Sequence, residues 1–205
     1  MRRLGVLVTA VVLMTAGSAF AQDESRGEFS LGWRYYHGTI NSVVDPIQVP
    51  QPNDYPKGWY ADIAVNASPK FAIVGEAGGT YFKDSYSSPS NIVSIEESYD
   101  LTLYTFMGGV RVRAPQHASV VPFGQVLFGA QRNTSEDEYR ITVLQSPPST
   151  SRRDATSSGP ALALDGGVTV AAGWVGVRAS VGYVRLFESA DADVFRFSLG
   201  AAFRF

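Results

Sequence analysis

The carboxyl-terminal segment constrains the fold of this chain more than any other part of the sequence. Phenylalanines share one parity there, and small or charged residues share the other: Phe195, Phe197, Phe203 and Phe205 against Arg196, Ser198, Gly200, Ala202 and Arg204. A period of two is typical of a β-strand with one apolar and one polar face. Because no turn or polar tail follows, we expect that this apolar face does not fold back into an ordinary core.

The amino-terminal end predicts export. A positive start at residues 1–3 is followed by the apolar run 4–16 and then by Ala19 and Ala21, two positions apart. These are the three parts of a secretory signal peptide, and the apolar run is short for a membrane-spanning helix. We therefore expect cleavage after Ala21. An uncleaved membrane anchor is the alternative.

The composition fits one exported domain without disulfides. Removing residues 1–21 from the 205 leaves 184, residues 22–205, and the loss of two arginines moves the formal net charge from −2 to −4. The domain is mildly acidic and has no basic run, so we expect no nucleic-acid partner. The chain has no cysteine. Its mean hydropathy of −0.01 is too polar for a helical membrane protein but suits a barrel, in which every second residue faces the lumen.

Eight segments of alternating polarity follow one another along this domain. Their approximate ranges are 27–36, 59–66, 71–82, 101–113, 120–132, 161–170, 175–186 and 193–205. Each has about the ten residues that cross a bilayer at a tilt. The pattern therefore predicts an all-β chain of eight antiparallel strands.

One strand has an ambiguous phase. In 101–113 an inward-facing Arg111 places Leu103 and Met107 inward as well, unless a bulge at Gly108-Gly109 resets the alternation.

The connections between these segments alternate in length. Long polar loops are predicted at about 37–57, 83–98 and 133–159, short turns lie between them, and a moderate loop precedes the last strand. The weak alternation of 138–144 would prolong one hairpin above the membrane. Outer-membrane barrels combine short periplasmic turns with longer outside loops, and an even strand number leaves both termini on the periplasmic side.

These features together resemble the small eight-stranded outer-membrane β-barrels of bacteria, the OmpA-like and OmpX-like group. The terminal pattern polar-x-Gly-x-x-aromatic-x-Phe is carried here by Ser198, Gly200, Phe203 and Phe205. The resemblance covers essentially all of 22–205 and implies an up-and-down transmembrane barrel. It also implies that the barrel-assembly machinery reads the terminal pattern. The partners that we expect are outer-membrane lipid, that machinery and an extracellular ligand bound through the loops of a monomer.

A soluble β-sandwich or a lipocalin-like barrel would alternate in the same way. Aromatic residues near both ends of the strands favour the membrane instead, because transmembrane barrels carry aromatic girdles at both interfaces. Near the long loops these are Trp33, Tyr35, Trp59, Tyr81, Tyr183 and Phe195, and near the short turns they are Phe29, Phe71, Trp174, Phe203 and Phe205.

With the apolar face in lipid, the lumen receives charged residues of both signs. We expect a network of Arg34, Asp62, Glu76, Arg111, Asp165, Arg178 and Arg196 there, beside Gln125. An eight-stranded barrel is just wide enough for its own side chains, and buried charges need partners. The sequence therefore predicts a lumen filled by salt bridges. An ion-conducting lumen is the alternative.

The sequence offers little for catalysis. Its two histidines are His37, at an outer strand end, and His117, in a predicted periplasmic turn with Ser119 two residues further on. We expect no enzymatic activity, cofactor or metal site. The predicted function is a structural or surface-interaction role, with long outside loops on a filled barrel. A narrow pore is the second hypothesis, and a lipid-modifying enzyme using His37 is the third.

Overall fold

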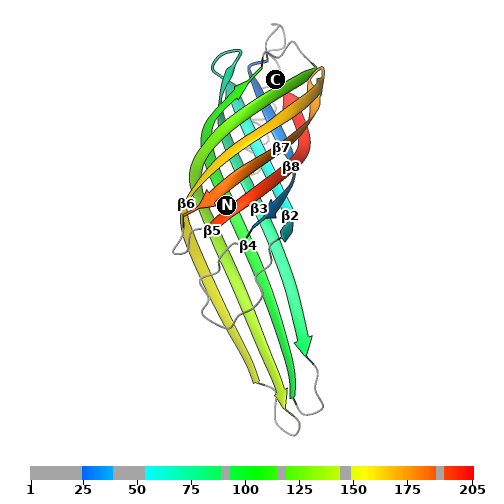
Figure 1. The fold of residues 1–205 in the computed structure, drawn as a ribbon, viewed down its shortest axis with the longest axis vertical. Coiled ribbons are helices and arrows are strands. Elements are labelled where there is room, and N and C mark those ends of the chain that lie inside the picture. The colour runs from blue at the N-terminus through cyan, green and yellow to red at the C-terminus, as the bar shows by residue number, and fades with distance from the viewer. Residues whose placement is uncertain (1–24, 39–53, 89–92, 115–118, 144–148, 188–191) are drawn as a thin grey trace, which may run out of the picture.

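The computed structural model describes residues 25–38, 54–88, 93–114, 119–143, 149–187 and 192–205. Its strands are β1 (Gly27–His37), β2 (Asp54–Asn66), β3 (Phe71–Ser88), β4 (Val93–Arg113), β5 (Val120–Val143), β6 (Ser149–Ala172), β7 (Val175–Leu186) and β8 (Ala192–Arg204). Each strand pairs antiparallel with the next, and β8 pairs with β1, so the sheet closes into a barrel (Figure 1). The predicted all-β, eight-stranded antiparallel barrel is confirmed. The predicted signal peptide and its cleavage site lie outside the described residues.

The alternation of side chains makes the outside of the barrel apolar. Along β3, Phe71 and Ile73 are exposed while Ala72 and Val74 are buried, and the other strands follow the same rule. A closed sheet pairs its backbone internally and an apolar outer band suits hydrocarbon, so these strands span a membrane. No helix in the described ranges is long and apolar enough to cross a bilayer.

Aromatic residues gather at both ends of the outer band. At one end Trp33 stacks on Tyr35, and Tyr183 contacts Phe195 edge-on. At the other end Trp174 packs on Phe203, with ring centroids 6.0 Å apart. The two groups mark the levels at which the barrel meets the two membrane–water interfaces.

The ambiguous strand keeps a single phase. Leu103 and Met107 are buried and Phe106 is 61% exposed, and the pairing of β4 with β3 and β5 is continuous through Gly108. No bulge resets the alternation there, because a register with Arg111 inside already buries the two apolar side chains. The register does shift elsewhere, between Arg34 and Tyr36 against β2, where the alternation of side chains does not predict a bulge.

Three predicted loops are wrong in extent. β3 and β4 pair as far as Ser88 and Ile95, β5 and β6 pair as far as Ile141 and Ser149, and β2 begins at Asp54. The predicted loops 83–98 and 133–159 are therefore mostly strand, and the loop 37–57 gives up its last residues to β2. These segments lack the apolar face that identifies a membrane strand, so their polarity suggested a loop.

The additional residues form a sheet that continues past the ends of the other four strands (Figure 1). We call it the projecting sheet and define it as residues 82–88, 93–101, 135–143 and 149–155. Its four strands are extensions of β3, β4, β5 and β6, so the barrel and the projecting sheet are one continuous hydrogen-bonded structure.

Candidate functional site

A buried carboxylate organises the middle of the lumen. Glu76 accepts two hydrogen bonds from Arg34, at 2.9 and 2.8 Å, and a third from Arg196 Nη1 at 2.8 Å. Arg196 also donates to Asp165 through Nε at 2.7 Å. The fork of Arg34 on Glu76 is a two-bond guanidinium–carboxylate pair, which fixes both side chains in orientation as well as in distance.

A second group of charges fills the lumen toward the short turns. Arg111 donates to Asp62 at 3.0 Å and to Glu28 at 3.2 Å. Arg178 donates to the same two carboxylates, and both guanidinium groups lie over the ring of Phe123, at 4.9 and 4.8 Å from its centre. The ring separates two cations while offering its negative face to each of them.

A glutamine joins the two groups. Gln125 accepts from Arg111 Nε at 2.8 Å and donates to Asp165 at 2.9 Å. Its amide therefore connects a cation of one group to an anion of the other, and the lumen holds one continuous network. Four carboxylates and four guanidinium groups belong to it, each at most 5% exposed: Glu28, Asp62, Glu76, Asp165, Arg34, Arg111, Arg178 and Arg196. Arg113 is buried as well, and Arg204 Nε lies 3.8 Å from Glu28 Oε2, so the buried cations outnumber the buried carboxylates.

All seven charged residues that the sequence assigned to the lumen lie in this network, and one member was missed. Glu28 shares the inward parity of Ser30 and Arg34, so the alternation of β1 could have identified it. Three hydroxyl groups also accept hydrogen bonds from the arginines. They belong to Ser30, Thr169 and Ser198.

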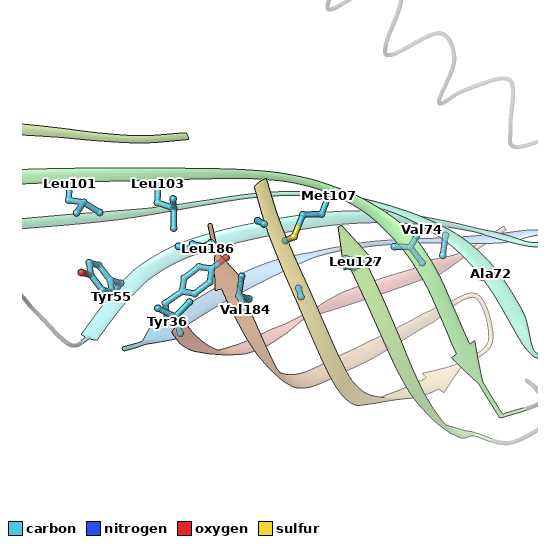
Figure 2. Close-up of a cluster of buried hydrophobic side chains, with 14 residues drawn as sticks. Tyr36, Tyr55, Ala72, Val74, Leu101, Leu103, Met107, Leu127, Val184 and Leu186 are labelled. Atoms are coloured by element: carbon cyan, nitrogen blue, oxygen red, sulfur yellow. The ribbon is translucent and has the colours of Figure 1, made fainter. Parts of the chain in front are cut away.

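An apolar layer closes the lumen on the side of the projecting sheet. Figure 2 shows Tyr36, Tyr55, Leu101, Leu103 and Leu186 among the side chains gathered inside the curved sheet. Each of these five side chains is at most 1% exposed. Asn133 and Ser135 are buried directly opposite Leu103 and Leu101, so an ion entering from this side would meet a tightly filled layer of mixed polarity before it reached the arginines.

The four residues of the terminal pattern lie along the closing seam of the barrel. Gly200 pairs with Gly32 of β1, and a Cβ on Gly200 would come within 2.3 Å of the Leu31 carbonyl oxygen. Ser198 faces the lumen and accepts from Arg34 at 2.9 Å. Phe203 packs against Trp174, and the backbone of Phe205 exchanges hydrogen bonds with Gly27.

The outer face of the projecting sheet is charged. Lys83, Asp100, Glu136 and Asp154 lie directly opposite one another across its four strands. Lys83 bonds Asp100 at 2.9 Å, and Arg152 bonds both Glu136 at 2.9 Å and Asp154 at 3.1 Å. These pairs are solvated, so they suit a surface in contact with water.

The projecting sheet also has two unpaired edges within the described part of the chain. On one side, β3 pairs with β2 only as far as Tyr81, so 82–88 pair with β4 alone. On the other side, β6 pairs with β7 only from Ala161, so 149–159 pair with β5 alone. Such an edge presents free N–H and C=O groups that can bind another extended segment.

His37 lies outside the barrel, above the outer aromatic residues. Its Nδ1 is 2.7 Å from Asp54 Oδ1, and the hydroxyl of Tyr35 donates to the same oxygen. Donation from the Tyr35 hydroxyl, and then the contact with His37, lowers the pKa of the Asp54 carboxyl. Among the described residues, no serine hydroxyl is hydrogen-bonded to His37, and no three His, Asp or Glu residues are placed to hold a metal. His117 lies outside the described residues.

Comparisons with known proteins find related folds but no related sequences. No family model matches the chain, and no curated protein matches it significantly. A crystal structure of Ail, the attachment invasion locus protein of Yersinia pestis, in complex with sucrose octasulfate aligns with a TM-score of 0.51 and 17% identity over 88% of this chain and 99% of Ail. Neisserial surface protein A aligns with a TM-score of 0.48 and 12% identity over 90% of this chain and all of its own.

The chain has the fold of the small eight-stranded outer-membrane barrels. The alignment with Ail spans nearly the full length of both chains, and the strand order here is the closed antiparallel one. At this identity the similarity concerns the fold alone. The fold and the apolar outer band support an outer-membrane location, as the resemblance implied.

Proposed function

We propose that this protein is a surface-interaction protein, in which the barrel anchors the projecting sheet outside the outer membrane. The observation that carries the proposal is the length of β5 and β6, which have 24 residues each and so exceed the roughly ten needed to cross a bilayer. Their additional residues are polar and project as ordered strands. A structure that only sealed or stabilised the membrane would not need them.

The free edge of β6 is the part of the projecting sheet best suited to bind a partner. It runs through 149–159 and is the longer of the two unpaired edges among the described residues. Its sequence is rich in serine and threonine, with the two longer side chains Arg152 and Arg153 among them. An extended peptide segment of a partner could add to it as a further strand, with main-chain hydrogen bonds providing affinity.

The comparison with Ail is compatible with this role. Ail is described as an attachment invasion locus protein, and its structure with sucrose octasulfate is described as a complex with a heparin analogue. The outer face of the projecting sheet carries both signs of charge here, so a polyanion is not the ligand that this surface favours. A protein segment that adds to the edge fits it better.

Shortening the β5–β6 hairpin tests the proposal. Ser135 and Ala155 lie opposite each other, so residues 136–154 can be replaced by an Asn-Gly turn without disturbing the barrel. Cells that display the shortened chain should lose adhesion to surfaces that bind cells displaying the full chain. Both chains should show the same heat-dependent gel mobility, which reports a folded barrel.

The β3–β4 hairpin provides the matched control. Lys83 and Asp100 are also directly opposite, so residues 84–99 can be replaced in the same way. This change removes the β3 edge and leaves that of β6, although it also unpairs residues 137–143 of β5 from β4. Adhesion that survives loss of the β5–β6 projection, or that disappears equally with either hairpin, would contradict a binding role for the β6 edge.

We further propose that the lumen is closed. Two successive barriers support this: the apolar layer near Leu101 and Leu103, and the charge network around Glu76. Single-channel recording of the purified chain in planar bilayers should show no steady conductance. Glu76→Ala opens the ionic barrier but leaves the apolar layer, so we expect at most brief, irregular openings. Well-resolved conductance from the unaltered protein would favour the pore hypothesis.

We also propose that the terminal pattern directs assembly, with both termini in the periplasm. Phe205 is bonded to Gly27 through its backbone, so its side chain contributes little to the hydrogen bonding of the seam. Deletion of Phe205 also removes these two backbone hydrogen bonds, whereas Phe205→Ala keeps them. Phe205→Ala should therefore lower the amount of folded protein in the outer membrane while export continues. An unchanged folded fraction at low expression would show that the terminal phenylalanine is not read.

We propose no catalytic role. His37 has an acid partner in Asp54, as the histidine of a hydrolase would, but none of the described hydroxyl groups is placed to act as its nucleophile. Analysis of outer-membrane lipids from cells with and without His37→Ala should therefore show the same acyl composition.

A further inference from the structure

Two glycines on the lipid-facing side of the barrel are not explained by packing within the protein. Gly75 of β3 and Gly108 of β4 are exposed and lie directly opposite each other. A Cβ on Gly75 would have its nearest neighbour, Ile63 Cγ2, at 3.8 Å, and a Cβ on Gly108 would have the Val74 carbonyl oxygen at 3.6 Å. Both are ordinary contact distances.

The adjacent Gly109 shows the contrast. A Cβ there would lie 1.9 Å from the Val126 carbonyl oxygen, so the backbone of β5 requires glycine at that position. In the Gly108-Gly109 pair, therefore, one glycine serves the packing of the sheet and the other does not. Glycine inside a strand costs stability, and it often marks a place where another molecule approaches closely.

Gly75 and Gly108 form the floor of an open groove. Ala61 and Ala77 extend the floor, and Phe106 and Phe128 stand beside it with 61% and 62% of their surface exposed. The groove has a volume of about 600 Å³ and is open along its lipid-facing side. Its lipid-facing wall and floor side chains are all apolar.

The position of the groove identifies what it meets. It lies between the outer aromatic residue Tyr81 and the inner one, Phe71, on the same strand as Gly75. It is thus continuous with the outer surface that the bilayer covers, at a depth where only hydrocarbon is present. A second copy of the barrel would have to bring one convex surface against another past Phe106 and Phe128, whereas a flexible chain reaches the floor directly.

We propose that this groove is a binding site for one acyl chain of a membrane lipid. The absent side chains at Gly75 and Gly108 leave room for the chain, and the two phenylalanines hold it from one side. The site would keep one lipid bound more firmly than the lipids around the rest of the barrel.

Native mass spectrometry of the full chain, extracted in mild detergent from membranes of native composition, tests this proposal. The unaltered protein should retain one lipid. In Gly108→Leu the new side chain occupies the floor, and retention should fall by about tenfold, the change expected when roughly two methylene groups lose their burial. Gly75→Leu fills the floor from the neighbouring strand and should act in the same way, so it substitutes if Gly108→Leu does not fold.

Gly166→Leu is the matched control. Gly166 is also exposed on the lipid-facing side, and a Cβ there would meet no atom within 4 Å, but it does not line the groove. Its lipid retention should equal that of the unaltered protein. Retention that is insensitive to both floor substitutions would overturn the proposal. So would a lipid-free complex of twice the mass that Gly108→Leu dissociates, because the groove would then hold a second copy of the chain.

Discussion

The barrel and the projecting sheet are built from the same strands, but their outer faces meet different surroundings: hydrocarbon around the barrel and water around the projecting sheet. Along the outward parity of β5, Val126 and Phe128 are apolar and exposed, and beyond Ala130 the same parity carries Arg132 and Glu136. The backbone pairing is continuous across this change. The backbone pairing therefore does not depend on the surrounding solvent. Only the outward side chains change from apolar to polar at the level where the membrane ends.

The two regions also differ in how far their charged side chains are buried. In the barrel, closure buries charged side chains, which are then held by several partners each, as Glu76 is by Arg34 and Arg196. In the projecting sheet, the ion pair of Arg152 and Glu136 is at least half exposed on both sides. A charge that can reach water needs no partner, whereas a buried one does. Ion pairs of similar length should therefore differ widely in their effect on stability.

Removing one carboxylate from each region is the strongest test of this difference. Glu76→Ala leaves Arg34 without its carboxylate partner, while Arg196 keeps Asp165, and we expect a loss of about 3–5 kcal/mol in the free energy of unfolding. Glu136→Ala, in the projecting sheet, should produce no measurable change. Urea unfolding in lipid vesicles, followed by gel mobility, gives both values under identical conditions.

Equal stability of the two variants would contradict the burial of Glu76. If the two variants unfold at the same urea concentration, then water reaches Glu76 and the lumen is hydrated at mid-depth. Glu76→Gln separates charge from shape, because it keeps an acceptor for Arg34 while removing the negative charge. It should lie between Glu76→Ala and the unaltered protein.

The second test compares the outer faces. Leu199 is 53% exposed on β8 within the apolar band, and an arginine there should cost about 2–4 kcal/mol at mid-depth of the bilayer. Thr142 is exposed on β5 in the projecting sheet, opposite Ser94, where arginine should be tolerated. Equal stability of Leu199→Arg and Thr142→Arg in vesicles would mean that Leu199 does not face lipid.

The fold could be predicted from the sequence because, in a closed barrel within a membrane, side chains along each strand alternate between lumen and lipid. This alternation appears in the sequence as a polarity pattern with a period of two. In β8, Phe195, Phe197 and Leu199 identify the lipid-facing side. Arg196 and Ser198 identify the side that faces the lumen. The same rule assigns Arg34, Glu76 and Arg196 to the lumen, and all three are buried in the structure. It works wherever one face is hydrocarbon and the other is not.

Most of the projecting sheet could not be predicted in this way, although the weak alternation of 138–144 did indicate the prolonged hairpin that β5 and β6 form as far as Ile141. Its outward residues, such as Glu138 and Arg152, are polar like those of a loop, and its inward side alternates polar with apolar residues. The period of two is therefore weak, and only the pairing of whole strands defines the extension. The β2 register shift near Tyr36 and the contact between Glu28 and Arg111 depend on which strands meet across the barrel, and no local pattern carries that information.

The smallest expected effect lies at the rim between the two regions, where Asp54 is exposed. The Tyr35 hydroxyl, and then His37, hold the pKa of the Asp54 carboxyl below its usual range. Because this pKa is lowered in the folded state, the contact stabilises the fold above the usual carboxyl pKa, and that contribution is lost as the pH falls through the lowered value.

Tyr35→Phe should therefore raise the pKa of Asp54, measured by carbon NMR of the carboxyl group in detergent micelles. Stability at neutral pH should fall only slightly, since the group is solvated and water replaces the lost donor. Phe197 contacts the Tyr35 ring, with ring centroids 6.0 Å apart, and Phe at position 35 keeps that packing. An unchanged pKa in Tyr35→Phe would assign the shift to His37 alone, and His37→Ala would then have to produce it in full. A large loss of stability in Tyr35→Phe would instead show that the rim is shielded from water like the lumen, and that the boundary between the two regions lies farther out than Tyr35.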